Sequence, residues 1–444
     1  MPTDLTPPPP KHLEMHSRCG ITIKPLTPDP HLIPTASEAR LRDLVMDFSS
    51  RLRPFVEDNR NISFLLGFTA TAYLAFATYR SATPESLSAS IHRSPQSTIA
   101  ELPKATKDAI PYPPNALPNP RDVPTPHGTI RTNLYGPSNT GRKVLLIHGI
   151  STPSVVFAPL ATRLADKHDY QVLTFDLFGR GYSDSPNPEI WRQDEGLWCS
   201  QIFAVLSSAG WLEERVAIVG YSLGGGIAAA FTYFYPERVE SLVLVAPSGV
   251  LRADRIAWSS RLIYSPLLPQ SFVEWLVTRR LRAGSKAAAK PEEADEATTI
   301  KSVGTSEIPS HPALMADSKA SPFPAGSGGS IAQSVTWQID NHPGYIASFV
   351  SSIRHAPITA QHERWRTIGE RQQENEQDDA LKERKVLVIL GREDGTIVPE
   401  ETAEDATAAF GRENVRVEVI EGGHDVVVVN AEGCGELLDE HLRA

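Results

Sequence analysis

The chain has 444 residues, which is long enough for one α/β domain of roughly 250 to 300 residues with extensions at its ends. Its net charge of -10 provides no basic surface for nucleic acid, so we exclude a nucleic-acid partner and favour neutral substrates. Only three cysteines occur, at positions 19, 199 and 434, which excludes a disulfide framework and a metal site built on cysteines.

The first 60 residues are rich in proline and polar side chains and lack the apolar core of a cleaved signal peptide, so we predict disorder there. An uncharged run, 62–79, follows between Arg60 and Arg80. As a helix it would span roughly 27 Å, close to the thickness of a bilayer's hydrocarbon core. This predicts a single membrane-spanning helix over 61–80. Its threonines make it only moderately apolar, so a buried or interfacial helix remains an alternative.

Arginines are more frequent before this run than after it, which favours a cytosolic N-terminus and a lumenal catalytic domain. The compartment itself stays unknown. Residues 81–127 are rich in proline and serine and are expected to form an extended tether.

From residue 128 onwards, short apolar runs alternate with stretches typical of helices. Strands are expected at 129–134, 143–147, 170–177, 215–220, 239–246, 385–390 and 415–420, and helices near 155–168, 191–208, 223–235, 400–410 and 431–442. Most of the strand runs are continuously apolar, as in strands that are covered by helices on both faces. The pattern predicts an α/β fold with a mostly parallel, doubly wound sheet, whose core comprises 128–247 and 385–444.

Residues 248–384 interrupt this alternation. Their first part is apolar and helix-prone, with large side chains at Trp258, Ile263, Leu267, Leu268, Phe272 and Trp275. A stretch of low complexity over about 283–330 is expected to be disordered. We interpret the interval as a helical cap inserted over the active site; a crossover with a long decoration is the alternative.

A serine between two glycines carries the clearest chemical signal. Gly220-Tyr221-Ser222-Leu223-Gly224 follows an apolar strand and precedes a helix rich in small residues. Turning from strand to helix within about two residues strains the serine backbone and leaves room only for small neighbours, which Gly220 and Gly224 supply. The pattern predicts that Ser222 is a nucleophile.

A serine nucleophile needs a base, and the base needs an acid that orients it. Asp394 follows the expected strand 385–390, and His424 follows the strand 415–420. Both side chains would lie at the carboxyl ends of parallel strands, where sites of open α/β sheets gather. We therefore predict His424 as base and Asp394 as acid, with Glu393 as the alternative acid.

His148 and Gly149 also follow a strand, at 143–147. They are expected to shape a turn that brings a backbone N–H toward the nucleophile. The N–H groups of Ile150 and Leu223 are the predicted oxyanion donors.

Five motifs occur in order: His148-Gly149, Asp176 to Asp184, Gly220 to Gly225, Gly391 to Pro399, and Gly423-His424. Together they resemble the successive signatures of the α/β-hydrolase superfamily, in particular its serine esterase- and lipase-like members. The resemblance covers about 128–442, without the middle of the insertion. It implies the same roles: Ser222 as nucleophile, His424 as base, Asp394 as orienting acid, and Ile150 and Leu223 as oxyanion donors.

We therefore expect a serine hydrolase that cleaves carboxylic esters through an acyl-enzyme and requires no cofactor and no metal. The apolar cap and the membrane segment favour a lipophilic ester or a monoacylglycerol-like lipid as the small-molecule substrate. Hydrolysis of a carbon–carbon bond or an amide, or acyl transfer, uses the same triad and remains an alternative. A catalytically silent binding or scaffold protein is a second alternative.

Overall fold

The computed structural model describes residues 90–99, 101–137, 141–288, 319–323, 328–373 and 384–444, together with Thr71 and Leu381. The chain consists of two compact units, 1–87 and 88–444, and the helices and strands described below belong to the second. The predicted disorder over 1–60 and nearly all of the predicted membrane segment lie outside the described residues. Among the described residues, no helix has the length and apolar character needed to cross a bilayer.

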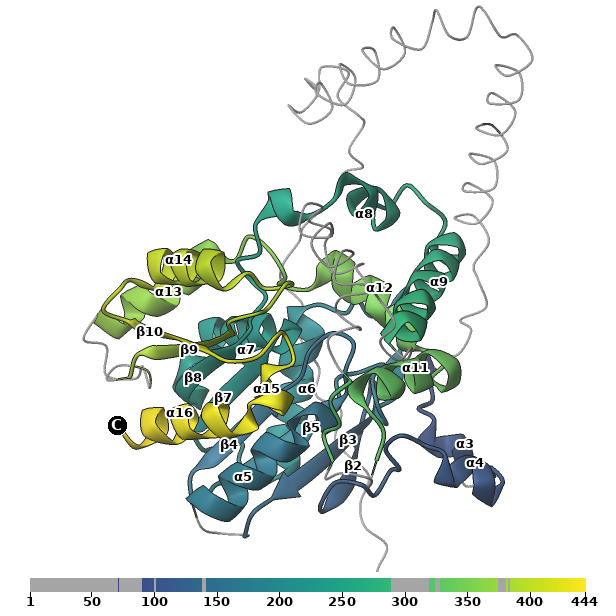
Figure 1. Cartoon of the computed structure of the whole chain (residues 1–444), viewed down its shortest axis with the longest axis horizontal. Coiled ribbons are helices and arrows are strands. Elements are labelled where there is room, and N and C mark those ends of the chain that lie inside the picture. Colours follow the sequence, from purple (N-terminus) through teal and green to yellow (C-terminus); the bar gives the residue numbers. More distant parts are fainter. Residues whose placement is uncertain are drawn as a thin grey trace, which may run out of the picture. The chain divides into compact units, whose positions relative to one another are not determined.

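An eight-stranded sheet forms the centre of this unit, in the order β10-β9-β8-β7-β4-β5-β3-β2 (Figure 1). The strands are β2 (Pro120–Thr125), β3 (Gly128–Tyr135), β4 (Lys143–Ile147), β5 (Gln171–Phe175), β7 (Val216–Tyr221), β8 (Val239–Val245), β9 (Val386–Gly391) and β10 (Val415–Ile420). All neighbours from β10 to β5 pair in parallel, whereas β3 runs antiparallel to both β5 and β2. The predicted mostly parallel sheet is confirmed.

Helices cover both faces of the sheet. They are α5 (Ala158–His168), α6 (Glu195–Ser208), α7 (Leu223–Phe234), α13 (His362–Gln373), α14 (Pro399–Phe410), α15 (Val426–Val429) and α16 (Ala431–Arg443). From β4 the chain steps through α5 to β5, and then steps in the opposite direction through α6, α7 and α14. Right-handed crossovers therefore place α5 on one face and the other three on the opposite face. Helix α16 packs against α5.

Continuous apolar runs form the central strands because both of their faces are buried. Every residue of β5, β7 and β9 is buried, and so are Val144 to Ile147 of β4. This burial explains why these strands could be recognised from the sequence without an alternating pattern.

The prediction of an extended tether over 81–127 is wrong for its second half. Residues 120–125 form β2, the edge strand, in which Val123 pairs with Ile130 of β3. Pro120 and Pro124 hid this strand, since proline lacks the N–H of a sheet ladder and is tolerated only at edges. Short elements precede it: β1 (Ile91–His92), which pairs with β6 (Ser185–Pro186), and the helices α3 (Gln96–Ile99) and α4 (Lys104–Asp108).

The insertion after β8 is largely helical where it is described. It contains a short 3-10 turn at Ala253–Arg255 and the helices α8 (Trp258–Ile263), α9 (Gln270–Ala288), α11 (Ile331–Asn341) and α12 (Tyr345–His355). Two further 3-10 turns, Ser154–Phe157 and Pro236–Arg238, lie before the insertion. Helix α9 packs against α11 and α12, so these three form one body. Most of the stretch expected to be disordered, about 283–330, lies outside the described residues.

The last helix of the interval does not belong to this cap. Helix α13 packs against α14 and α7, which cover the sheet. The ring of Trp365 stacks on Phe410 at 4.8 Å, and the Asn414 side chain donates to the Gly369 carbonyl at 2.9 Å. The cap therefore ends before residue 362, and the predicted boundary at 384 was too late. The charged surface of α13 gave no sign of this packing.

Candidate active site

Ser222 lies at the sharp turn between β7 and α7. Its backbone has φ 55° and ψ -120°, a strained conformation for a residue with a side chain. A Cβ atom at Gly220 would meet the Gly224 carbonyl, and one at Gly224 would meet the Ile147 carbonyl. The two glycines are therefore required by close backbone approach, as the sequence indicated.

His424 reaches this serine from the loop after β10. Its Nε2 lies 3.0 Å from Ser222 Oγ, and its Nδ1 lies 2.8 Å from Asp394 Oδ2. A carboxylate only accepts, so Nδ1 carries the proton and Nε2 accepts from the serine hydroxyl. The three side chains are buried and form a continuous hydrogen-bonded chain.

Asp394 is itself held in place by backbone groups. Its Oδ1 accepts from the N–H groups of Thr396 and Ile397, each at 2.8 Å, which leaves Oδ2 for the histidine. Glu393, the alternative acid, is exposed. The structure thus brings together Ser222, His424 and Asp394, and it leaves Glu393 outside the cluster.

His148 orients the peptide that would carry one oxyanion donor. Its Nε2 accepts from the Leu177 N–H at 2.8 Å, so its Nδ1 bears the proton and donates to the Gly149 carbonyl, also at 2.8 Å. Burial lowers the pKa of His148 to about 3, which keeps the ring neutral. Because the Gly149 carbonyl and the Ile150 N–H belong to one trans peptide, this bond sets the direction of that N–H.

Both expected oxyanion donors lie beside the serine. A Cβ atom at Gly149 would come within 3.1 Å of Ser222 Cβ and 3.5 Å of its Oγ, so the loop of Ile150 adjoins the hydroxyl. Leu223 begins α7, and the first N–H groups of a helix have no partner within it. The positive end of the α7 dipole points the same way.

The two aspartates of the 176–184 segment stabilise loops instead of joining the triad. Asp176 accepts from the backbone and hydroxyl of Ser154, and Asp184 accepts from the N–H groups of Ser94 and Thr129. Burial raises the pKa of Asp176. Sequence reasoning missed Arg180 within the same segment, and the charged residue between two glycines was the available signal.

The cavity at Ser222 is small, about 20 Å³. It is lined by Gly149, Ile150, Ser151, Thr152, Val156, Tyr221, Ser222, Ile331, His424 and Asp425. This volume is close to what one water molecule needs, so the described residues leave no room for an acyl group in the cavity at Ser222. Ile331 at the start of α11 is the residue through which the cap closes over the serine.

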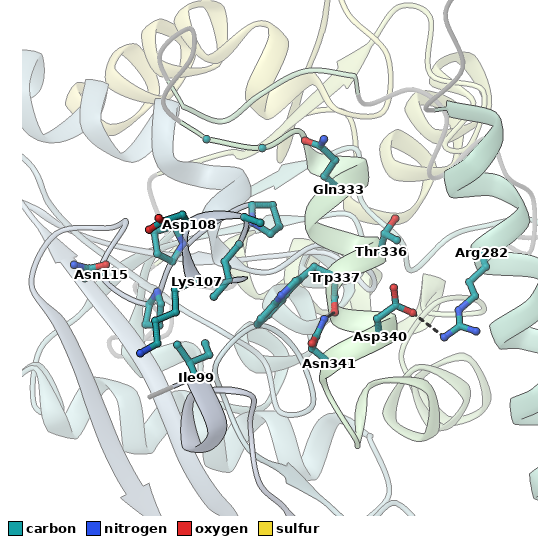
Figure 2. A pocket seen from close by; sticks show the side chains of 17 residues that line it. Ile99, Lys107, Asp108, Asn115, Arg282, Gln333, Thr336, Trp337, Asp340 and Asn341 are labelled. Atoms are coloured by element: carbon teal, nitrogen blue, oxygen red, sulfur yellow. Dashed lines mark hydrogen bonds and ion pairs between the residues drawn. The ribbon is translucent and has the colours of Figure 1, made fainter. Parts of the chain in front are cut away.

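A much larger cavity, about 1330 Å³, lies away from the triad (Figure 2). Trp337 and Asp340 of α11 line one side, Lys107 of α4 lines the other, and the Arg282–Asp340 ion pair stands at its edge. None of the predicted site residues contributes to its lining. Its size alone therefore gives it no part in the chemistry at Ser222.

Cys199 and Cys434 are not among the residues that line the cavity at Ser222. Cys199 and Cys434 are buried, and burial raises the pKa of each thiol to about 12. Within the described part of the chain, no group of three or more His, Cys, Asp or Glu side chains could hold a metal ion. Cys19 lies outside the described residues.

Comparison with known proteins places this geometry in a family. The family model of the α/β hydrolase fold matches residues 143–431. The chain belongs to this family. The fold expected from the five sequence motifs is thereby confirmed.

Individual relatives of this α/β hydrolase match only part of their length. A 2-hydroxymuconate semialdehyde hydrolase of Pseudomonas is 37% identical over 126 residues, which are 27% of this chain and 41% of the relative. A pimeloyl-[acyl-carrier protein] methyl ester esterase of Aliivibrio salmonicida is 34% identical over 146 residues, 33% of this chain and 50% of the relative. The chain thus spans half or less of the length of these relatives.

A solved structure shows the same fold over a longer range. The crystal structure of a putative lipase from Acinetobacter baumannii superposes with a TM-score of 0.50 at 17% identity, and it covers 79% of this chain and 95% of that chain. At this identity, the similarity shows the fold alone.

Proposed function

We propose that the protein is a serine hydrolase that cleaves carboxylic esters through an acyl-enzyme. The observation that carries the proposal is the hydrogen-bonded chain from Ser222 Oγ through His424 to Asp394, at 3.0 and 2.8 Å. Geometry of this kind activates a hydroxyl for attack on a carbonyl.

Each group has one role in the proposed reaction. His424 Nε2 takes the proton as Ser222 Oγ attacks the ester carbonyl, and it returns that proton to the departing alcohol. The N–H groups of Ile150 and Leu223 stabilise the oxyanion of the tetrahedral intermediate. Water, activated by His424, then attacks the acyl-enzyme and releases the acid and free Ser222.

The charges around the site favour a neutral acyl group. The residues that line the cavity at Ser222 include no lysine or arginine, and one of them is the carboxylate of Asp425. A substrate with a carboxylate near the scissile bond would meet no cationic side chain among the residues that line this cavity. This supports an uncharged ester.

Carbon–carbon hydrolysis is the second candidate, favoured by the 37% identity with 2-hydroxymuconate semialdehyde hydrolase. The two reactions are separated by incubating the protein with p-nitrophenyl esters and, separately, with 2-hydroxymuconate semialdehyde. Product analysis by liquid chromatography should show ester turnover and an unchanged semialdehyde. Faster consumption of the semialdehyde would replace the ester proposal.

A lipophilic substrate is supported by the outer surface of the cap, which we call the cap face and define as Trp258, Leu262, Leu267, Phe272 and Trp275. Trp258, Leu267 and Trp275 are 76%, 67% and 55% exposed, and the rings of Phe272 and Trp275 stack at 5.8 Å. These side chains do not line the cavity at Ser222. Their exposure supports contact with a lipid surface and not a role in lining the acyl-binding site.

The charge on these helices is opposite to that of the whole chain. Residues 253–282 contain five arginines and two acidic residues, and the Arg279 guanidinium lies 5.9 Å from the centre of the Trp275 ring. Tryptophan and arginine together suit the interface of an anionic membrane. We therefore propose that the protein acts on lipophilic or monoacylglycerol-like esters at a membrane.

Vesicle binding and chain-length preference test this part. In a chain that carries Leu66→Arg/Leu74→Arg, which removes the apolar run 62–79 as a source of binding, co-sedimentation should be stronger with anionic vesicles than with neutral ones, and Trp258→Ser/Trp275→Ser added to this chain should abolish most of that binding. Trp191→Ser, at an exposed tryptophan outside the cap, is the matched control. Much faster hydrolysis of short soluble esters than of long-chain glycerides would remove the lipid substrate from the proposal.

Membrane anchoring through residues 62–79 and a lumenal catalytic domain are also proposals, supported by the uncharged run and the flanking arginines. Carbonate extraction of membranes should retain the full chain. A Leu66→Arg/Leu74→Arg variant, which places two charges in the run, should be released. Release of the unaltered chain would leave only peripheral binding.

A further inference from the structure

Three successive backbone carbonyls beside Ser222 each accept a hydrogen bond from a side chain. We call residues 149–151 the oxyanion loop. The Gly149 carbonyl accepts from His148, the Ile150 carbonyl from Arg180 Nε at 3.0 Å, and the Ser151 carbonyl from Tyr345 and Gln338, both at 3.1 Å. A loop held at every carbonyl has little freedom to turn its N–H groups away from the serine.

Arg180 is the central member of this set. Its guanidinium is wholly buried, and besides Ile150 it donates to the Phe178 carbonyl at 3.0 Å and to Ser352 Oγ at 2.8 Å. All three acceptors are neutral. Within the described residues, no carboxylate forms an ion pair or hydrogen bond with this guanidinium.

Burying a charge that has no oppositely charged partner destabilises the folded protein. A buried arginine without a carboxylate beside it therefore needs a physical explanation. Burial lowers the pKa of Arg180 to about 10, which leaves the group protonated at neutral pH. Its positive charge therefore persists next to the residue whose N–H is the proposed oxyanion donor. Fixed positive charge in a site of low dielectric stabilises negative charge that develops nearby.

The same residue joins the loop to the cap. Ser352 belongs to α12, as does Tyr345, whereas Gln338 belongs to α11 and also accepts from the Gly181 N–H at 2.7 Å. Cap helices thus contact the oxyanion loop directly and through Arg180. The arrangement of the cap and that of the loop are coupled by these bonds.

We propose that Arg180 is a positioning residue of the oxyanion hole: it fixes the Ile150 backbone, ties it to the cap through Ser352, and adds positive charge behind the hole. This inference rests on the proposed serine hydrolase function. It assigns to the arginine between Gly179 and Gly181 a role in transition-state stabilisation in addition to packing.

The test compares Arg180→Gln and Arg180→Lys with the unaltered full chain on a p-nitrophenyl ester. Removal of one oxyanion donor costs roughly 100- to 1000-fold in turnover, and an indirect loss should cost less. We expect Arg180→Gln to lower kcat by about 10- to 100-fold with KM changed by less than about threefold. Arg180→Lys, which keeps the charge, should recover part of this loss.

The inhibition constant of a trifluoromethyl ketone should stay unchanged if Arg180 serves only in packing. Ser222 Oγ would add to its carbonyl, and the resulting hemiketal oxyanion occupies the same hole. Its inhibition constant should rise by the same factor as kcat/KM falls. Arg131→Gln, at a buried arginine that pairs with Asp122, is the control and should lower Tm without changing either quantity.

Each outcome decides the inference. Folded Arg180 variants that keep kcat and ketone affinity within about twofold would overturn it. If neither variant folds, Ser352→Ala, which removes the α12 acceptor of Arg180 and leaves the guanidinium in place, decides: a selective fall in kcat supports the coupling, and unchanged kcat rejects it. An unaltered chain without ester turnover would instead contradict the proposed function.

Discussion

The imidazole of His424 lies 3.0 Å from the hydroxyl of Ser222, although 202 positions separate the two residues in the chain. Ser222 follows β7 and His424 follows β10, and because these strands run in the same direction, their carboxyl ends lie at the same end of the sheet. Their contact depends on groups that hold each residue in turn, namely the glycines around Ser222 and the carboxylate of Asp394. Changing any of these groups should therefore lower activity or stability.

Asp394→Asn should reduce kcat by about three to four orders of magnitude while the fold is kept. The amide oxygen would continue to accept from the Thr396 and Ile397 N–H groups, so the amide NH₂ would face His424 Nδ1. That nitrogen would then have to accept, which moves the ring proton to Nε2 and prevents it from acting as a base. Steady-state kinetics on a p-nitrophenyl ester measures the effect.

Glu393→Gln is the control for this change, because Glu393 is adjacent in sequence but exposed. Its kcat should stay close to that of the unaltered protein. If the two variants exchanged their effects, the orienting acid would have to be reassigned to Glu393.

Gly224→Ala should destabilise the protein and reduce its activity. The added methyl group would meet the Ile147 carbonyl. The backbone at this junction of β4, β7 and α7 is buried, so moving it away would disrupt the packing of all three elements. Overpacking of this kind costs about 1 to 3 kcal/mol. Thermal unfolding followed by circular dichroism should show a lower Tm, together with slower ester hydrolysis.

Gly395→Ala is the matched control, because a Cβ atom at Gly395 meets no other atom within 4 Å. Its Tm should change little, although it lies next to Asp394. An equal fall in Tm in both variants would mean that the contact between the added methyl group and the Ile147 carbonyl is not the cause of the destabilisation at Gly224.

Stability should fall as the pH drops below about 6.5. Burial lowers the pKa of His148 to about 3 and that of His342 to about 4. Both rings are neutral in the folded protein, whereas the unfolded chain takes up protons below 6.5. Their contribution is therefore complete above pH 6.5 and is lost as the pH falls toward 4, by up to about 1.4 kcal/mol per pH unit for each histidine.

Denaturant unfolding between pH 8 and pH 4.5 measures this dependence. Nδ1 of His342 accepts from the Gly344 N–H while Nε2 donates to the Ser183 carbonyl, so protonation would remove one bond. His342→Gln should lower stability at neutral pH and make the pH dependence shallower. A free energy of unfolding that stays constant between pH 7 and pH 5 would contradict the account.

The sequence predicted the parts of the fold that follow from local rules. Continuous apolar runs identified the buried strands, and the glycines around Ser222 identified the turn that holds it. The polar loops after β9 and β10 identified Asp394 and His424, because the carboxyl ends of neighbouring parallel strands lie at the same end of the sheet. Each of these signals lies within a few residues of the feature that it predicts.

What the sequence could not show depends on contacts between distant segments. The prolines of β2 are disfavoured in a central strand and are acceptable because β2 is the edge strand of the sheet formed by the described residues. Helix α13 looked like part of the cap until Trp365 was found stacked on Phe410. The glycines on both sides of Arg180 single it out in the sequence, but its partners on α12 and on the oxyanion loop are distant in the chain and follow only from the fold.

Labelling with a fluorophosphonate probe tests the central claim most directly, since an activated serine attacks the phosphorus, displaces fluoride and becomes phosphonylated. The unaltered full chain should be labelled, and peptide mass mapping should place the phosphonyl group on Ser222. Ser222→Ala should remain unlabelled while keeping its circular dichroism spectrum. A folded, unaltered chain that does not react, or that reacts at another residue, would contradict the account and favour a catalytically silent binding protein.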